Sequence, residues 1–361
     1  MTEQKKYRFV DALRGIAILG VILPHIENTG VFGIIGQYGV QLFFVLSAFT
    51  LFLSLDAKFK VEQNPIRNFF IRRFFRIAPA FYLAALFYLI KNGSGATFWA
   101  PDGIHLWQII TTLGFVHGWH PASINSVVPG GWSIASEFMF YLFVPWCYLH
   151  IKEKYQAISL SFLLLFVGLY LNGLMFAKVS SVYPGKEAFV NYFFQLWFPA
   201  QVCVFPLGFF LYFLFKDKKD SDKNDKAEAL RWLLISIFLW LAFTGGGYIY
   251  LLPNFMYGLS FVLFSYALSL YPFKFFVNTL TCYFGKLSFS MYLFHFAVIG
   301  FVKDYIIPLI SSNNQTHVAI IFYLSVLAIT TGVATFTFYL IEQPGQAIGR
   351  KIIEYFETKE K

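Results

Sequence analysis

Long apolar runs constrain the fold of this chain more than any other feature. Ten runs are each long enough to cross the roughly 30 Å hydrocarbon core of a bilayer as a helix. They fall at residues 9–27, 38–56, 70–90, 132–150, 155–176, 191–215, 231–249, 255–271, 284–302 and 317–341. Only 13% of the residues are charged, about half the share found in soluble domains. We therefore predict an all-α membrane protein, a single polytopic bundle of about ten transmembrane helices.

The distribution of basic residues predicts the orientation of this bundle. With the N-terminus in the cytoplasm, the cytoplasmic segments hold 23 of the 28 Lys and Arg residues and the outer segments hold 4. Cytoplasmic loops of membrane proteins carry such an excess. An even number of spans returns the C-terminus to the cytoplasm, so both termini are predicted to be cytoplasmic. The net charge of +9 is then a consequence of membrane orientation, and we expect no nucleic-acid partner.

Two segments outside the predicted spans have features of their own. The outer loop at residues 91–131 is rich in Gly and Pro and contains an apolar stretch, 106–116, that is too short to span a bilayer. We predict a re-entrant segment there, because such backbone is tolerated at membrane depth only where it lines protein or a water-filled cavity. Residues 343–361 are predicted to be a short basic cytoplasmic tail after a transmembrane domain at 1–342. The three cysteines are far apart and indicate neither a disulfide framework nor a metal site.

Two ionisable residues lie inside the first predicted helix. Arg14 and His25 are eleven residues apart, which places them on one helix face and about 16 Å apart along the axis. Ionisable residues at membrane depth are costly to bury and usually mark a functional site. A histidine that is satisfied by a backbone carbonyl is the alternative for His25. Asp11 is expected to cap the helix or to pair with Arg14.

An arginine cluster opens the third predicted helix. Arg72, Arg73 and Arg76 are spaced so that they form one cationic surface. With Arg14 at a similar depth, they would bind a polyanion such as the phosphates of a nucleotide-bearing cofactor, because the guanidinium fork binds phosphate bidentately. The alternative is that these residues are cytoplasmic anchors whose side chains snorkel to the membrane surface.

A carboxylate is predicted to lie at the depth of His25. Glu137 is about five residues into a helix that enters from the outside. A carboxylate in an apolar helix needs a partner, and His25 is the candidate. A histidine held by a glutamate is a competent general base for a hydroxyl group.

Other polar residues are candidates for contacts with the reacting groups. Ser288, Tyr292 and His295 share a face of the ninth predicted helix, although hydrogen bonding between helices would explain them equally. His117 and His120 have an HxxH spacing, but no Cys or carboxylate lies close by, so we expect no metal site. These two histidines are instead predicted to line the outer mouth of the bundle.

Five segments, in this order, resemble the acyltransferase 3 family of integral-membrane O-acyltransferases. They are YRFVDALRGIAILGVILPHI, RRFFRIAP, GGWSIASEFMFY, GKLSFSMYLFHF and YLIEQP. The resemblance covers about residues 7–345. It implies transfer of an acyl group, usually acetyl from acetyl-coenzyme A, across a bacterial cytoplasmic (inner) membrane onto a hydroxyl of an extracytoplasmic glycan. Lipopolysaccharide O-antigen and capsular polysaccharide are examples of such acceptors. Acetyl-CoA would be a co-substrate, and no tightly bound cofactor is implied.

The family's motif positions fall on matching residues of this chain. The family's first-helix Arg and His fall on Arg14 and His25, and its third-helix pair falls on Arg73 and Arg76. Its remaining positions fall on Trp132, Ser133, Glu137, Ser288, Tyr292 and His295. Trp132 or Tyr292 would donate a hydrogen bond to the developing oxyanion, and the sequence does not choose between them. Some members carry a fused hydrolase-like domain after the last helix. We expect this chain to act alone or with a separate partner.

Two other functions fit parts of the same pattern. A transporter or flippase for a small anion or a glycan would also have ten helices with intramembrane charges, but the sequence shows no inverted repeat. A non-catalytic scaffold for glycan assembly would not explain the matching depths of His25 and Glu137. The oligomeric state is left open.

Overall fold

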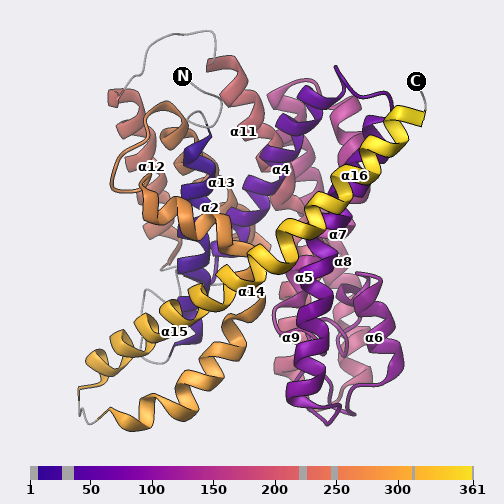
Figure 1. The fold of residues 1–361 in the computed structure, drawn as a ribbon, viewed down its shortest axis with the longest axis vertical. Coiled ribbons are helices and arrows are strands. Elements are labelled where there is room, and N and C mark those ends of the chain that lie inside the picture. Colours follow the sequence, from indigo (N-terminus) through magenta and orange to yellow (C-terminus); the bar gives the residue numbers. More distant parts are fainter. Residues whose placement is uncertain (1–6, 27–35, 219–225, 245–250, 311–313, 360–361) are drawn as a thin grey trace. The chain divides into compact units, whose positions relative to one another are not determined.

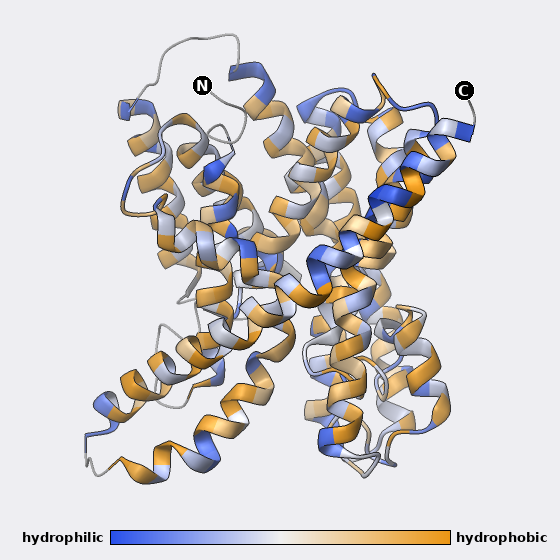
Figure 2. Ribbon diagram, viewed as in Figure 1, coloured by the Kyte–Doolittle hydropathy of each residue, from blue (hydrophilic) through white to orange (hydrophobic). Residues whose placement is uncertain are grey.

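The structure is a computed structural model, and it describes all residues except 1–6, 27–35, 219–225, 245–250, 311–313 and 360–361 (Figure 1). The described residues are almost entirely helical, and their only β-pairing is an isolated bridge between Thr97 and Ala100. Figure 2 shows hydrophobic residues along most of the helices. Six described helical segments are long and apolar enough to cross a membrane: Gly39–Lys58, Pro65–Asn92, Lys154–Val182, Phe198–Lys218, Thr279–Leu309 and Gln315–Lys359. The predicted all-α class is therefore confirmed for the described residues, and these six segments are candidate membrane spans.

The other four predicted ranges also contain helices, but these are not among the six. They are α2 (Arg8–Ile22), α7 (Gly131–His150), α12 (Lys226–Thr244) and α13 (Leu251–Leu270). Residue 27 and residues 245–249 of the predicted ranges lie outside the described part. Ten spans and their orientation therefore stay a prediction.

The chain divides into two compact units, which are described separately. Unit 1 comprises Met1–Leu46, Leu214–Gly247 and Met256–Leu340. Unit 2 comprises Ser47–Phe213, Tyr248–Phe255 and Ile341–Lys361. The chain passes from one unit to the other within four described helical elements: α4 (Gly39–Lys58), α11 (Phe205–Lys218), α13 and the π-helix Phe338–Glu342.

Unit 1 is built around α2 and α14 (Thr279–Tyr305), which pack together with no side chain between them at one point. A Cβ added to Gly285 would overlap the carbonyl oxygen of Asp11, and one added to Gly15 would overlap the carbonyl oxygen of Thr281. Small residues permit such close backbone approach between membrane helices. α15 (Gln315–Thr337) packs against α14 and follows the 3-10 turn Ile307–Leu309.

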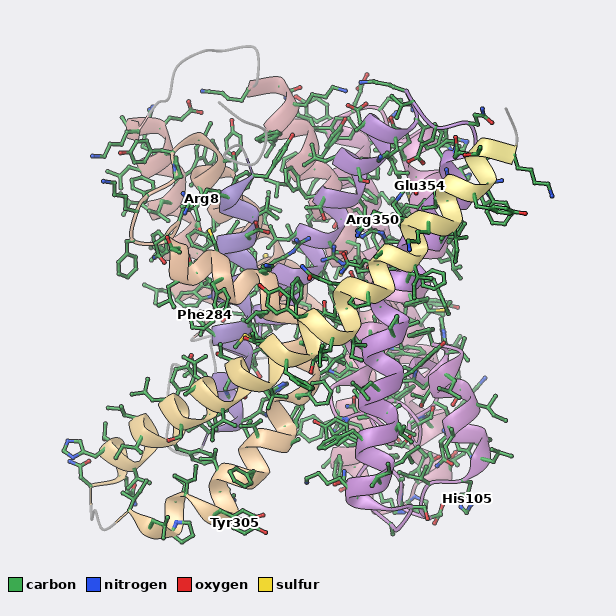
Figure 3. The ribbon with its side chains drawn as sticks, viewed as in Figure 1. Arg8, His105, Phe284, Tyr305, Arg350 and Glu354 are labelled. Atoms are coloured by element: carbon green, nitrogen blue, oxygen red, sulfur yellow. The ribbon has the colours of Figure 1, made fainter. Side chains whose placement is uncertain are left out.

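The glycine contact also fixes how α2 and α14 are aligned. Gly15 lies against Gly285, and the ring of His25 lies against that of His295. The sequence separation between Gly15 and Gly285 equals that between His25 and His295. α2 and α14 therefore run parallel, and their register does not change from the glycine contact to the histidine pair. Figure 3 marks Phe284 part-way along α14 and Tyr305 at its end. The close glycine packing thus brings two histidines from distant parts of the sequence together.

The first helix ends earlier than an uninterrupted α-helix through residue 27 would. α2 stops at Ile22 and continues as a 3-10 turn, Leu23–His25, with Pro24 inside it. A 3-10 turn advances about 120° per residue rather than about 100°. His25 is therefore rotated by roughly 60° from the face that the regular spacing from Arg14 predicts.

Unit 2 contains α5, α7, several shorter helices and the C-terminal helix. Its elements are α5 (Pro65–Asn92), α6 (Leu106–Leu113), the 3-10 turn His117–Trp119, α7, α8 (Lys154–Val182), α9 (Glu187–Leu196), α10 (Phe198–Gln201), the 3-10 turn Val202–Val204, most of α11, and α16 (Gln343–Lys359). The predicted span 191–215 is interrupted. α9 ends at Leu196 because Trp197 is extended (ψ 157°) and precedes the pair Phe198–Pro199. The apolar stretch of the outer loop forms the eight-residue α6, and its predicted re-entrant position stays a prediction.

The segment predicted to be a basic tail is a helix that packs along α5 (Figure 1). A Cβ added to Gly345 would lie 2.8 Å from Pro79, and one added to Gly349 would lie 2.8 Å from Phe75. At the far end of α16, the Glu357 carboxylate accepts a 2.7 Å hydrogen bond from the Asn68 side chain of α5. These contacts make α16 part of unit 2.

Candidate functional site

The four arginines at the start of α5 differ in the hydrogen-bond and ion-pair partners of their guanidinium groups. Arg72 donates two hydrogen bonds to the Glu62 carboxylate, at 2.7 and 3.1 Å. Arg67 lies 3.9 Å from Glu357 and stacks on an aromatic ring of α16 at 4.8 Å. These two guanidinium groups are therefore neutralised by carboxylates, and Arg72 is a poor candidate for donor binding.

Arg73 and Arg76 keep donors that nothing in the described part of the chain accepts. The Nε of Arg73 is buried and has no hydrogen-bond partner there. The guanidinium of Arg73 lies 5.9 Å from the Phe69 ring and is close enough to Glu137 to attract it electrostatically. Arg76 forms no ion pair with any described carboxylate, and its side chain is half-buried. Of the predicted cluster on α5, these two arginines are the ones that can bind an anion.

Glu137 is the centre of a polar cluster inside unit 2. Its Oε1 accepts hydrogen bonds from the hydroxyl groups of Ser47 and Tyr141, each at 2.5 Å. Ser47 comes from the part of α4 that belongs to unit 2, and Tyr141 is one turn further along α7. The cluster therefore joins α4, α7 and, through the charge of Arg73, α5.

His25 and Glu137 lie in different units, so their predicted pairing stays a prediction. In unit 1 the His25 ring lies beside two other aromatic rings. The ring centroids of His295 and Phe296 lie 5.5 Å and 4.5 Å from that of His25. The His25 side chain is exposed, whereas His295 is fully buried with 0% exposure. An exposed imidazole at the end of a helix is accessible to a substrate hydroxyl group.

The other candidates of unit 1 flank this histidine pair. Ser288 and Tyr292 are buried on α14, two turns and one turn before His295, respectively. Arg14 is half-buried on α2, and its Nη1 lies 3.9 Å from Oδ1 of Asp11, as predicted for that pair. The rise from Arg14 to His25 along the helix is about 16 Å.

His117 and His120 do not converge on a shared site. His117 is buried, stacks on Phe81, and donates from Nε2 to the carbonyl oxygen of Gly131 at 3.0 Å. Burial lowers the pKa of His117 to about 4. His120 is exposed, its Nδ1 accepts a hydrogen bond from the Ala122 N–H at 3.2 Å, and its ring meets that of Trp107 edge-on. Partial burial lowers the pKa of His120.

Trp132 and Ser133 mainly shape the start of α7. The backbone N–H of Trp132 donates to the Asn125 side chain at 3.2 Å, and the Ser133 hydroxyl donates to the Gly130 carbonyl oxygen at 3.3 Å. Both side chains are buried. Together with the His117–Gly131 bond, these contacts fix the outer loop to the helix that carries Glu137.

Sequence reasoning missed two residues of the Glu137 cluster. Ser47 is one of three hydroxyl residues in a largely apolar helix, and Tyr141 lies four residues after Glu137, on the same helix face. The four-residue spacing of Glu137 and Tyr141 was a usable signal. Ser47 gave no usable signal, because a serine in a membrane helix commonly forms a hydrogen bond with its own backbone.

Two further features bear on the type of site. The described residues contain no group of three or more His, Cys, Asp or Glu residues able to hold a metal ion. A half-open cavity of about 290 Å³ in unit 2, between α7, α8 and α10–α11, is lined by aromatic and aliphatic side chains and Cys147. That cavity offers no polar group to orient a reacting atom.

Comparison with known proteins gives matches along almost the whole chain. A protein of Staphylococcus aureus (strain COL) named "Putative O-acetyltransferase SACOL0978" is 29% identical over 395 aligned residues, which cover 98% of this chain and 60% of the relative. "O-acetyltransferase OatA" of Staphylococcus aureus (strain NCTC 8325 / PS 47) is 25% identical over 389 residues, covering 97% of this chain and 59% of the relative. The chain thus spans about 60% of the length of these relatives. No solved structure matches.

A family model, the acyltransferase 3 model, described as an acyltransferase domain, matches residues 7–339. This range includes Arg14, His25, the α5 arginines, the Glu137 cluster and His295. The chain therefore belongs to the acyltransferase 3 family.

Proposed function

We propose that this protein is a multi-pass membrane O-acetyltransferase. It takes an acetyl group from acetyl-coenzyme A, which binds from the cytoplasmic side, and transfers it to a hydroxyl of an extracytoplasmic glycan. The family match and the O-acetyltransferase names of the relatives support this assignment. The proposed bundle has ten spans and cytoplasmic termini in a bacterial cytoplasmic membrane, with α6 as a re-entrant element.

The arginines with available donors are assigned to the acyl donor. Arg73 and Arg76 bind phosphates of coenzyme A, because a desolvated guanidinium forms strong bidentate hydrogen bonds with phosphate. Arg14 provides a third cation in unit 1. The pantetheine arm of the donor is long and thin and matches the ~16 Å rise from Arg14 to His25 along α2.

His25 is assigned as the general base, and its exposed imidazole is the observation that carries the proposal. The acceptor hydroxyl gives its proton to His25 while its oxygen attacks the thioester carbonyl carbon. The C–S bond then breaks, and the leaving thiolate of coenzyme A takes that proton. Trp132 or Tyr292 is the proposed donor to the developing oxyanion. Ser133, Ser288, His117 and His120 are proposed only as structural supports of the acceptor side.

Turnover by the purified full chain tests this function. The protein is reconstituted in liposomes with acetyl-coenzyme A and a panel of oligosaccharides, and free coenzyme A and acetylated glycan are measured by mass spectrometry. We expect equal amounts of both products. Movement of a glycan or a small anion across the vesicle with no release of coenzyme A would instead favour a transporter.

A further inference from the structure

The hydrogen-bonding state of His295 is determined by its surroundings. Its Nδ1 lies 2.7 Å from the carbonyl oxygen of Tyr292. A carbonyl oxygen can only accept a hydrogen bond, so Nδ1 carries the hydrogen atom. In a neutral imidazole the other nitrogen, Nε2, then has a free lone pair.

This lone pair has no donor in the described part of the chain. His295 is fully buried, and its Nε2 has no hydrogen-bond partner among the described residues. An unsatisfied buried acceptor is costly, and native proteins retain few of them. Such an acceptor points to a donor that it meets at another stage of the protein's work.

His25 is the candidate donor, because its ring lies beside that of His295. The centroids of the two imidazole rings are 5.5 Å apart and the rings are inclined at 42°. At this separation, ring nitrogens that face each other are roughly 3 Å apart, which is hydrogen-bond distance. Phe296 lies against both rings, with centroids 4.5 Å from that of His25 and 4.1 Å from that of His295. A hydrogen bond between the two rings would require one N–H of the exposed His25 ring to turn toward Nε2 of His295.

Resting on the proposed function, we infer that His295 positions His25 for catalysis by accepting a hydrogen bond at Nε2 from the His25 ring. This bond fixes the tautomer of His25, so that its other nitrogen carries the lone pair that takes the proton of the acceptor hydroxyl. The imidazolium that forms keeps its hydrogen bond to His295 until it passes the new proton to the leaving thiolate. His295 itself gains and loses no proton.

The same role is less suited to Glu137. Its Oε1 already accepts two hydroxyl hydrogen bonds inside unit 2, and the charge of Arg73 lies close by. The orienting partner of His25 is then a neutral imidazole of its own unit, held in register by the contact between Gly15 and Gly285.

Two substitutions separate this role from a packing role. His295→Asn keeps a polar atom near the position of Nδ1 but has none near Nε2, whereas His295→Gln places an amide oxygen near the position of Nε2. We expect kcat for acetyl transfer to fall about 100-fold in His295→Asn, with KM for acetyl-coenzyme A within about twofold. His295→Gln should recover kcat to within about tenfold of the wild type.

The matched control is Thr330→Val on α15 of the same unit. Thr330 is also fully buried, and its hydroxyl has no partner among the described residues, so we expect wild-type kcat. Nitrogen-15 NMR of histidine-labelled protein provides a second readout. The His25 signal should report one tautomer in the wild type and a mixture in His295→Asn, even where that variant is less stable.

The outcomes distinguish this inference from the proposed function. If His25→Ala is inactive but His295→Asn retains wild-type kcat, His295 does not position His25 and the proposed function stands. If His295→Asn and His295→Gln lose kcat equally with an unchanged His25 tautomer, the role of His295 is packing and the inference is overturned. If His25→Ala transfers acetyl at the wild-type rate, the general-base assignment itself fails.

Discussion

The histidine pair of unit 1 and the Glu137 cluster of unit 2 differ in how their polar atoms are hydrogen-bonded. Both place ionisable groups among apolar helices, where an unpaired polar atom is costly. Glu137 is held by two hydroxyl groups at 2.5 Å and lies near Arg73. The His25 ring lies beside the rings of His295 and Phe296, and Nε2 of His295 has no hydrogen-bond partner among the described residues.

The difference separates groups that stabilise from groups that react. The Glu137 carboxylate accepts hydrogen bonds from the Ser47 and Tyr141 hydroxyl groups and so joins α4 to α7. An exposed imidazole beside an unsatisfied acceptor is available for proton transfer. The same contrast appears on α5, where Arg72 is bound by Glu62, whereas Nε of Arg73 has no hydrogen-bond partner among the described residues.

The largest effect is expected from the contact that aligns the two histidines. Gly285→Ala would force a methyl group into the carbonyl oxygen of Asp11, so α2 and α14 must separate. We expect the variant to lose its cooperative thermal transition in detergent and all acetyl transfer. Gly300→Ala lies on the same helix with no atom within 4 Å of the added Cβ, and should behave as the wild type. Equal stability of the two variants would disprove the close packing.

The arginine contrast is the next test. Arg76→Ala should raise KM for acetyl-coenzyme A about 30-fold, because a charge-assisted hydrogen bond contributes about 1.5–3 kcal/mol. Arg72→Ala should leave KM within about twofold, since Glu62 already holds that guanidinium. Steady-state kinetics at a range of donor concentrations measures both. A larger effect on KM from Arg72 than from Arg76 would reverse the assignment.

Acid should weaken unit 2 through His117. Its pKa is lowered to about 4 by burial, so the folded protein resists a proton that the unfolded chain binds below about pH 6.5. The stability contributed by neutral His117 is complete above that pH and is lost as pH falls toward 4, by roughly 2–3 kcal/mol. The midpoint of thermal unfolding should fall less between pH 7 and pH 4.5 in His117→Gln than in the wild type. An identical pH dependence would show that His117 is not the group responsible.

The smallest effect is expected from the hydroxyl groups that hold Glu137. Tyr141→Phe removes one hydrogen bond to the carboxylate and should lower the free energy of unfolding by about 1–2 kcal/mol. Ser47→Ala should cost a similar amount, and the double variant tests whether the two bonds are coupled. Both variants should retain kcat within about threefold of the wild type. A loss of kcat comparable to that of His25→Ala would place the Glu137 cluster among the reacting groups.

The sequence predicted the helical class and most helix positions because apolar length is a strong signal in membrane proteins. It also named Arg14, His25 and the cluster of Arg72, Arg73 and Arg76 as candidate site residues, and their roles stay predictions. It did not predict the docking of α16, since the contacts of Gly345 and Gly349 with α5 involve residues that are far apart in the chain. The pairing of Arg72 with Glu62, ten residues away, and the burial of His117 were also missed, because both depend on how loops fold back against the helices. Spacing along a helix gives the face of a residue but not its partner.

The most direct test of the central claim uses sealed vesicles that contain the full chain, with labelled acetyl-coenzyme A on the side of the predicted cytoplasmic face and an acceptor oligosaccharide on the other side. Wild-type protein should acetylate the oligosaccharide across the membrane, with one coenzyme A released per acetyl group. His25→Ala should release none above background, although it still binds the donor. Equal acetylation by His25→Ala and the wild type would contradict the account.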